Sequence, residues 1–507
     1  MKKNLYYNIV ASIISPVITL VCGFILPRLI LLNYGSEVNG LISSINNYLG
    51  FIGLMDLGVG AVIQSLYFGP LVNRDNTLLN KIYFASTRFF HKLGIILCIY
   101  VVFVCYLFSA IIKTQTTNIF NVMLILSIAI SLFGQYYFAI PKVLILNADQ
   151  KYYIQALIQS LLMILNTAIS VLLIRFGCSI QILKLVGSMI FLIRPLALKM
   201  IINKNYKFNK TYADKNYHIE QKWNGLAQHI ATVVMDNTDI MILTVMSSIK
   251  SVSIYSVYNL VINGLKTTIN ATSNGFLSLF GTLYAKKDYL KLRESFDYYN
   301  WIVHFISIIL FNCTMILLVP FVMLYTGGVD DANYFQPIFA ILLTISGLVY
   351  CLRVPYNTII CAIGHFKATQ KSAVIEPILN IVVSIIVVKD FGLAGVAIGT
   401  IVAITYRFLY FCRYVNDTLF DNAIQKQIKL TIICIFEAIP MIVIASITLL
   451  KMGNVVNSII TWFILAIITL AVTTLIIVFI NTLFYKKYLQ RTLTLFVNIV
   501  ASKRKTK

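Results

Sequence analysis

The sequence has few charged residues, and this scarcity excludes a water-soluble fold. Only 12% of its 507 residues are charged, whereas 59% are hydrophobic and the mean hydropathy is +0.84. A chain of this composition exposes too much apolar surface to remain in water. Acidic residues are scarcest, with 18 Asp and Glu against 41 Lys and Arg, which gives a formal net charge of +23. A membrane protein carries such an excess on its cytoplasmic loops, so nucleic acid is not expected as a partner.

Several motifs that would indicate an enzyme are missing. The nine cysteines form no CxxC pair, which removes the case for a disulfide framework or a metal site. The longest inside connection, residues 203–222, contains no GxxxxGK[ST] phosphate loop. Outside connections of only about five to ten residues leave no room for a catalytic domain. We therefore expect no catalytic residues, no metal and no cofactor apart from a coupling ion, and secondary transport remains as the function class.

Long apolar runs dominate what is present. A bilayer core about 30 Å thick requires roughly 20 apolar residues per helix. Fourteen such runs occur, at about residues 5–32, 38–67, 93–112, 119–140, 152–174, 180–202, 223–246, 251–283, 302–325, 335–361, 372–388, 391–411, 430–450 and 456–484. With the amino terminus inside, 33 of the 41 Lys and Arg residues fall on inside segments. The sequence therefore predicts an all-α integral membrane protein with fourteen transmembrane helices and both termini in the cytoplasm.

A weak internal repeat relates the first six runs to the next six. Ordered matches occur at a shift of 213 to 216 residues, for example Asn8 with Asn224, Ser43 with Ser256 and Pro141 with Pro355. Because six is even, both halves share one orientation and form a parallel repeat. We predict two pseudo-symmetric six-helix lobes, residues 1–202 and 223–415, joined by a cytoplasmic linker, 203–222. Helices 13 and 14 occupy 416–484, and a basic cytoplasmic tail occupies 485–507.

Ionisable residues inside the spans are the first candidates for a transport site. Each costs at least ~2.5–3.5 kcal/mol at the bilayer centre. Asp56 lies in the second run, Asp236 and Asp239 lie one turn apart in the seventh, and Lys266 lies in the eighth. Arg28 is one turn from the outer end of the first run. We expect Arg28 and Lys266 to hold an anionic headgroup, while one of the three acids takes up H⁺ or Na⁺. The alternative is a set of fixed ion pairs between helices.

Two further acids lie in later runs. Glu376 is next to Pro377 near the inner end of the eleventh run, where capping or contact with water is expected. Glu437 lies closer to the membrane middle on a helix outside the repeat, and the sequence suggests no role for it.

Three stretches resemble one family of membrane transporters. They are NYGSEVNGLISSINNYLGFIGLMDLGVGAVIQSLY at 33–67, VMDNTDIMILTVMSSIKSVSIYSVYN at 234–259 and IEPILNIVVSIIVVKDFGLAGVAIGTI at 375–401. Each resembles the corresponding segment of the Wzx-like bacterial polysaccharide repeat-unit flippases, of the multidrug/oligosaccharidyl-lipid/polysaccharide (MOP) exporter superfamily. The likeness covers roughly residues 1–415. It implies a MATE-like fold of two six-helix lobes around an alternating-access cavity, with helices 13 and 14 supplying a groove for a lipid tail.

The resemblance also implies a substrate and a location. The family moves undecaprenyl-pyrophosphate-linked oligosaccharides across the bacterial cytoplasmic membrane for O-antigen, capsule or exopolysaccharide synthesis. Arg28 and Lys266 are the positions matched to the family's cavity cations, Asp56 precedes the LGxG turn, and residues 236–239 resemble the helix 7 pattern. Sugars would need amide partners, for which the candidates are Asn46, Asn47, Gln64, Asn259, Asn263 and Asn270. Membrane lipids and the polymerase and glycosyltransferases of the pathway are the expected partners.

Three other functions stay open at this point, one of them a purely structural scaffold, against which the ionisable residues inside the spans argue. A multidrug cation exporter of the same superfamily would favour an acidic, aromatic cavity and usually twelve helices, which the basic residues and two extra spans disfavour. A membrane polysaccharide polymerase would normally need a substantial outside loop.

Overall fold

The structure is a computed structural model, and it is helical throughout the part of the chain that it describes. That part comprises residues 2–56, 58–206, 208, 209, 217, 226–451, 458–492 and 494, and no strand occurs within it. Eleven of its helical segments are long and apolar enough to cross a membrane. Each of the fourteen predicted spans overlaps a helix, although the count of fourteen stays a prediction. The expectation of an all-α, multi-pass membrane protein is confirmed.

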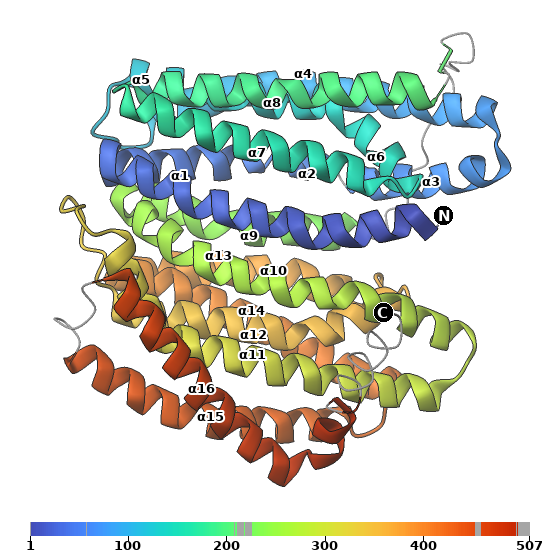
Figure 1. Ribbon diagram of the computed structural model, residues 1–507, viewed down its shortest axis with the longest axis vertical. Coiled ribbons are helices and arrows are strands. Elements are labelled where there is room, and N and C mark those ends of the chain that lie inside the picture. The colour runs from blue at the N-terminus through green and yellow to red at the C-terminus, as the bar shows by residue number, and fades with distance from the viewer. Residues whose placement is uncertain are drawn as a thin grey trace, which may run out of the picture. The chain divides into compact units, whose positions relative to one another are not determined.

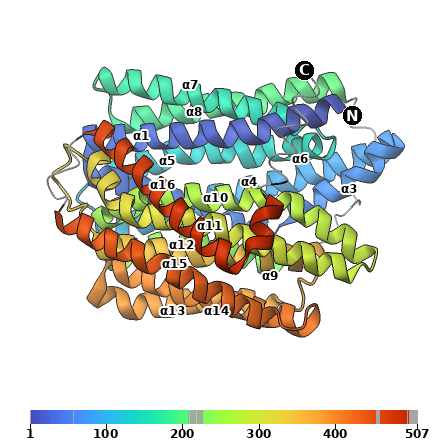
Figure 2. The same ribbon diagram turned by 60° about the horizontal axis from the view of Figure 1, so that its bottom comes forward.

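The helices divide into two contact units. Unit 1 holds the chain up to Ser256 together with residues 328–332. Its helices are α1 (Lys2–Gly50), α2 (Gly53–Asp56), α3 (Val59–Asn73), α4 (Asn76–Ala110), α5 (Asn118–Gly134), the π-helical turn η1 (Gln135–Ala139), α6 (Ile140–Ala148), α7 (Tyr152–Arg175), α8 (Ile180–Asn205), α9 (Leu226–Met246) and the start of α10 (Ile249–Ala285) (Figure 1). Figures 1 and 2 both show α7 and α8 side by side in this unit.

Two glycines interrupt the helices at the first two predicted spans, one between the spans and one within the second. Gly35 has φ 80° inside α1, so this long helix is two helices joined at a kink between the predicted spans. Gly58 has φ 69° just before α3 and separates it from α2. A side chain at either position would strain the backbone, whereas glycine adopts positive φ readily. The second span is therefore built from three helical pieces.

The outer faces of the helices remain apolar, as a lipid environment requires. On α4, Leu97 and Val104 are fully buried in a core cluster with Leu41 and Ile125. Ile99, on another face of α4, is 69% exposed. Exposing this apolar side chain to water would be unfavourable, whereas lipid chains solvate it without such a cost.

Unit 2 holds residues 257–327 and the chain from 333 onward. Its helices after α10 are α11 (Tyr289–Tyr325), α12 (Pro337–Ala362), α13 (Gln370–Phe391), α14 (Leu393–Thr418), α15 (Ala423–Lys451) and α16 (Ile459–Phe484). The pair α13 and α14 lies side by side (Figure 2). A Cβ at Gly395 of α14 would lie 2.7 Å from the backbone of Val387 in α13, which explains the small residue there.

The contact units and the predicted lobes have different boundaries. The contact division falls within α10, between Ser256 and Val257, whereas the repeat predicts a boundary in the linker 203–222. In that linker, residues 207, 210–216 and 218–222 lie outside the described residues, as do 493 and 495–507 of the predicted tail. The predicted lobes stay a prediction.

Candidate functional site

Lys266, one of the two predicted cations, is half-buried on α10 in unit 2. Its ammonium lies 5.1 Å from the centroid of the Tyr350 ring on α12. Arg28 is half-buried on α1 in unit 1, and no described residue bonds its guanidinium. The two predicted cations therefore belong to different units.

Tyr350 brings a second cation to Lys266. The Arg353 guanidinium carbon lies 5.1 Å from the same ring centroid, so the two charges are no more than about 10 Å apart. Asn270, one turn beyond Lys266 on α10, donates a hydrogen bond of 3.0 Å from its Nδ2 to the Tyr350 hydroxyl. An aromatic ring attracts a cation by about 0.5–2 kcal/mol, which offsets part of the repulsion between the two charges. An anion lying between them would offset more.

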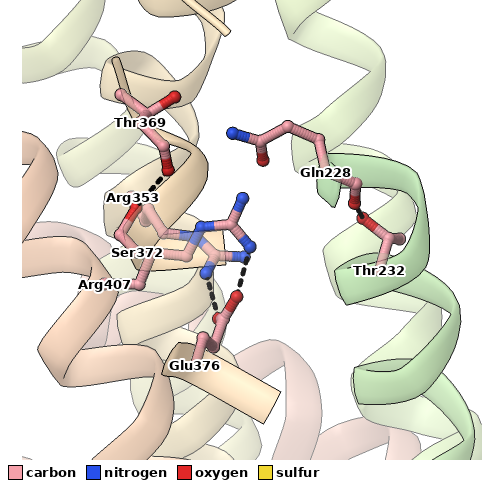
Figure 3. A network of polar contacts seen from close by, with 7 residues as sticks. All are labelled: Gln228, Thr232, Arg353, Thr369, Ser372, Glu376 and Arg407. Atoms are coloured by element: carbon pink, nitrogen blue, oxygen red, sulfur yellow. Dashed lines mark hydrogen bonds and ion pairs between the residues drawn. The ribbon is translucent and has the colours of Figure 1, made fainter. Parts of the chain in front are cut away.

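Glu376 completes the cluster from α13. It is 1% exposed, and its two carboxylate oxygens accept one hydrogen bond each, from Arg353 of α12 and from Arg407 of α14. Figure 3 shows both guanidinium groups directed at this carboxylate. Earlier in the same helix, in the first turn of α13, the Ser372 hydroxyl donates a hydrogen bond of 2.8 Å to the Thr369 backbone oxygen. Three helices thus supply one ionic centre.

The balance of charge in this cluster is positive. We call Lys266, Tyr350, Arg353, Glu376 and Arg407 the cation cluster. Three cations and one carboxylate give these side chains a combined charge of +2. Guanidinium groups bind phosphate with two parallel hydrogen bonds, whereas ammonium acts as a point charge. The cluster has the donors and the charge to bind a doubly negative phosphate group.

The predicted acids have different surroundings from one another. Asp239 of α9 is 6% exposed, and the Tyr255 hydroxyl of α10 donates to its Oδ2 at 2.8 Å. Asp236, one turn earlier, is exposed. Asp56 is the last residue of α2, and its side chain lies outside the described part of the structure. The assignment of H⁺ or Na⁺ to one of these acids stays a prediction.

The predicted sugar contacts also differ in their exposure and bonding. Asn46 and Asn263 are exposed, and Gln64 and Asn259 are half-buried. Asn47 donates to the backbone oxygen of Ser43 in its own helix at 2.9 Å. Of the six amides, Asn270 is the one that contacts the cation cluster, through Tyr350.

Sequence reasoning missed the ionic centre of the cluster. Arg353 and Arg407, which lie within α12 and α14, were not among the predicted site residues. The expectation that Glu376 caps a helix or faces water is wrong, because two arginines bury and neutralise it. The available signal was one ionisable residue near the inner end of each of three consecutive runs.

An open pocket lies on α15 and α16, the helices outside the predicted repeat. Its volume is about 610 Å³, and Ile428, Ile432, Phe436, Ile480 and Phe484 give it an apolar wall. Gln425 and Lys429, in the first turns of α15, are its polar lining residues. The Lys429 ammonium lies 5.6 Å from the ring centroid of Tyr485.

Solved structures of membrane transporters have a similar fold. The Lipid II flippase MurJ, in an inward closed conformation, superimposes with a TM-score of 0.68 at 17% identity, over 95% of this chain and 99% of that one. The chain shares the fold of this flippase. A multidrug resistance MATE family transporter of the MOP superfamily, in an inward-facing conformation, gives 0.57 at 16% identity, over 80% of this chain and 98% of that one. A eukaryotic MATE transporter gives 0.58 at 14% identity, over 85% and 98%. No protein-family model and no curated protein matches the sequence.

Proposed function

We propose that this protein is a flippase for lipid-linked oligosaccharides. In this proposal it moves an undecaprenyl-pyrophosphate-linked repeat unit across the bacterial cytoplasmic membrane by alternating access. The cargo serves O-antigen, capsule or exopolysaccharide synthesis, and H⁺ or Na⁺ provides coupling. The protein acts as a secondary transporter rather than an enzyme.

The observation that carries the proposal is the cation cluster on a transporter fold. A pyrophosphate diester carries two negative charges, which match the combined charge of +2 on the cluster residues. Lys266 and Arg353 each lie 5.1 Å from the centroid of the Tyr350 ring, so a phosphate beside this ring would be attracted by both charges. The apolar pocket on α15 and α16 supports a place for the lipid tail, with Lys429 at its polar lining.

A multidrug cation exporter is the second candidate, because MATE transporters share the fold. A positive cluster would repel a cationic drug, whereas it would attract a phosphate. The two functions therefore predict opposite consequences for removal of a positive charge. Loss of Lys266 would weaken flipping but would favour, or leave unchanged, the export of cations.

The test is complementation of a strain that lacks its polysaccharide flippase. The wild-type chain is expected to restore surface glycan. Lys266→Met keeps side-chain length but removes the charge, and it should lower export at least tenfold while lipid-linked oligosaccharide accumulates facing inward. Arg28→Ala and Asp56→Ala should do the same. Exposed Lys291, at 74% side-chain exposure, supplies the matched control Lys291→Met, which should export normally.

A parallel strain depleted of its lipid II flippase separates two cargoes that share the diphosphate. Rescue of the polysaccharide strain alone supports a repeat-unit cargo, and rescue of the lipid II strain alone would replace that cargo with lipid II. Full export by Lys266→Met, Arg28→Ala and Asp56→Ala would contradict the site assignment.

A further inference from the structure

A second buried carboxyl group, Glu437, lies where three helices of unit 2 meet. The residue belongs to α15 and is 2% exposed. Its Oε1 accepts a hydrogen bond of 2.7 Å from Nδ2 of Asn481 on α16. Its backbone oxygen accepts a bond of 3.2 Å from Nδ2 of Asn312 on α11. The group is fixed by amides rather than by a cation.

The surroundings of Glu437 favour its neutral form. Ile308, Cys434 and Ile477 form a buried apolar cluster beside it. In the described parts of α11, α15 and α16, no Lys or Arg bonds its carboxyl group. A carboxylate buried in apolar surroundings with one amide donor loses far more hydration than that donor returns. Burial of this kind makes the proton-bound carboxyl group the less costly form at this place.

Other titratable groups lie on the same elements, and the cations among them have partners of their own. These groups include Cys434, Lys426 and Lys429 of α15, His304 and Asp297 of α11, and Tyr485 just after α16. His304 bonds the Asn300 backbone oxygen at 2.8 Å and the Gln427 amide at 2.9 Å. Lys429 lies over the ring of Tyr485, and Lys426 pairs with Asp297. None of these cations is bonded to Glu437.

The bond between Glu437 and Asn481 lies directly behind the wall of the apolar pocket. Phe436, the neighbour of Glu437 in α15, lines the pocket, as does Ile480, the neighbour of Asn481 in α16. Asn481 also accepts a bond of 2.9 Å from Nε1 of Trp301 on α11. A change at the carboxyl group therefore acts on both helices that form the pocket.

We propose that Glu437 is a proton-binding site whose loading is coupled to occupation of the pocket between α15 and α16. This inference rests on the proposed function for the identity of the occupant, a polyprenyl chain, but not for the proton site itself. With the proton bound, Glu437, Asn481 and Trp301 hold α15 and α16 against α11. When the proton leaves to water, the carboxylate requires hydration, so α15 separates from α11 and the pocket changes shape.

Trp301 is a built-in reporter of this site. The full chain carries three tryptophans, at 223, 301 and 462, so a Trp223→Phe, Trp462→Phe background leaves Trp301 alone. In lipid nanodiscs, a pH titration of its fluorescence should show one transition. Glu437→Gln, which mimics the protonated acid and keeps the bond to Asn481, should abolish that transition while the folded yield is unchanged. Cys434→Ser and His304→Gln are the controls, and both should keep it.

Coupling is tested with undecaprenyl phosphate added to the same nanodiscs. If the two sites are coupled, the lipid must shift the pH midpoint of the transition. The free energy of that shift must equal the change in lipid-binding free energy that the proton causes. Absence of a transition in the parent, its persistence in Glu437→Gln, or its loss in His304→Gln would overturn the proton site. An unmoved midpoint would overturn the coupling. Failure of glycan export in the complementation test, with the transition intact, would refute only the flippase.

Discussion

Two buried polar sites, one in unit 1 and one in unit 2, are satisfied in different ways: neutral donors serve the first, and an ionic centre forms the second. In unit 1, the Ser44 hydroxyl bonds that of Thr244 at 2.8 Å, and Tyr255 donates to Asp239. In unit 2, Glu376 is enclosed by two arginines. Losing one neutral donor removes a single hydrogen bond from a buried group. Removing one member of a buried ionic centre leaves the remaining charges uncompensated, which costs more. Substitutions should therefore be tolerated in the first arrangement and poorly tolerated in the second.

Glu376→Gln should give the largest effect. It leaves two guanidinium groups, with side-chain exposures of 13% and 6%, without their counter-ion. Removing one partner of a buried ion pair costs about 3–5 kcal/mol. We expect a large fall in the midpoint of thermal unfolding in detergent and in folded yield. The control is Asp417→Asn. Asp417 lies 3.6 Å from the guanidinium of Arg413, whose side chain is 81% exposed, so this substitution should cost less than about 1 kcal/mol. Equal effects of the two variants would contradict the comparison.

Gly40→Ala should give the next effect, in unit 1. A Cβ at this position of α1 would lie 1.9 Å from the backbone oxygen of Ile249 at the start of α10, and backbone cannot turn aside as a side chain can. Overpacking of this kind costs about 1–3 kcal/mol. Gly69→Ala in α3, where nothing lies within 4 Å, should be neutral or slightly stabilising. A Gly40→Ala protein with an unchanged unfolding midpoint would show that α1 and α10 pack less closely.

The parts of this comparison differ in how far they follow from sequence. Hydropathy predicted the helical membrane fold because lipid admits only a narrow range of backbone structures. Lys266 was selected because a lysine deep in a span is costly and requires a partner. Arg353 and Arg407 were missed because long side chains near helix ends ordinarily reach water, so the sequence gives them no reason to be buried.

The partners of the buried charges depend on tertiary packing, which the sequence pattern does not predict. Glu376 finds its arginines through the packing of α12, α13 and α14, and no spacing along the chain encodes which helices become neighbours. The same limit applies to Tyr350, whose aromatic ring would serve equally well in an apolar core. Depth in the membrane is readable from sequence, whereas partnership between helices is a property of the fold.

Tyr255→Phe should have a moderate effect in unit 1. It removes one donor from Asp239 without changing the shape of the side chain. Hydrogen bonds between membrane helices reach at most about 1.7 kcal/mol in measured cases, so the loss should not exceed that value. Tyr106→Phe on α4, at 64% exposure, is the matched control and should leave the unfolding midpoint in place. A loss as large as that of Glu376→Gln would mean that Asp239 belongs to an ionic centre of its own.

Ser44→Ala should have the smallest effect on stability. The size of this effect measures how far the neutral hydrogen bond of unit 1 differs from the ionic centre of unit 2. The average interhelical hydrogen bond in a membrane protein contributes about 0.6 kcal/mol. A double-mutant cycle with Thr244→Val isolates the bond from the loss of each hydroxyl alone, provided that neither variant makes a new contact. We expect a coupling of about that size from unfolding in detergent. Thr244 also donates to the Ile240 backbone oxygen at 2.6 Å, so the helix can retain one of its bonds when Ser44 is absent. A coupling several times larger would place this neutral pair in the same class as the arginines of unit 2, and burial rather than charge would then govern tolerance in both units.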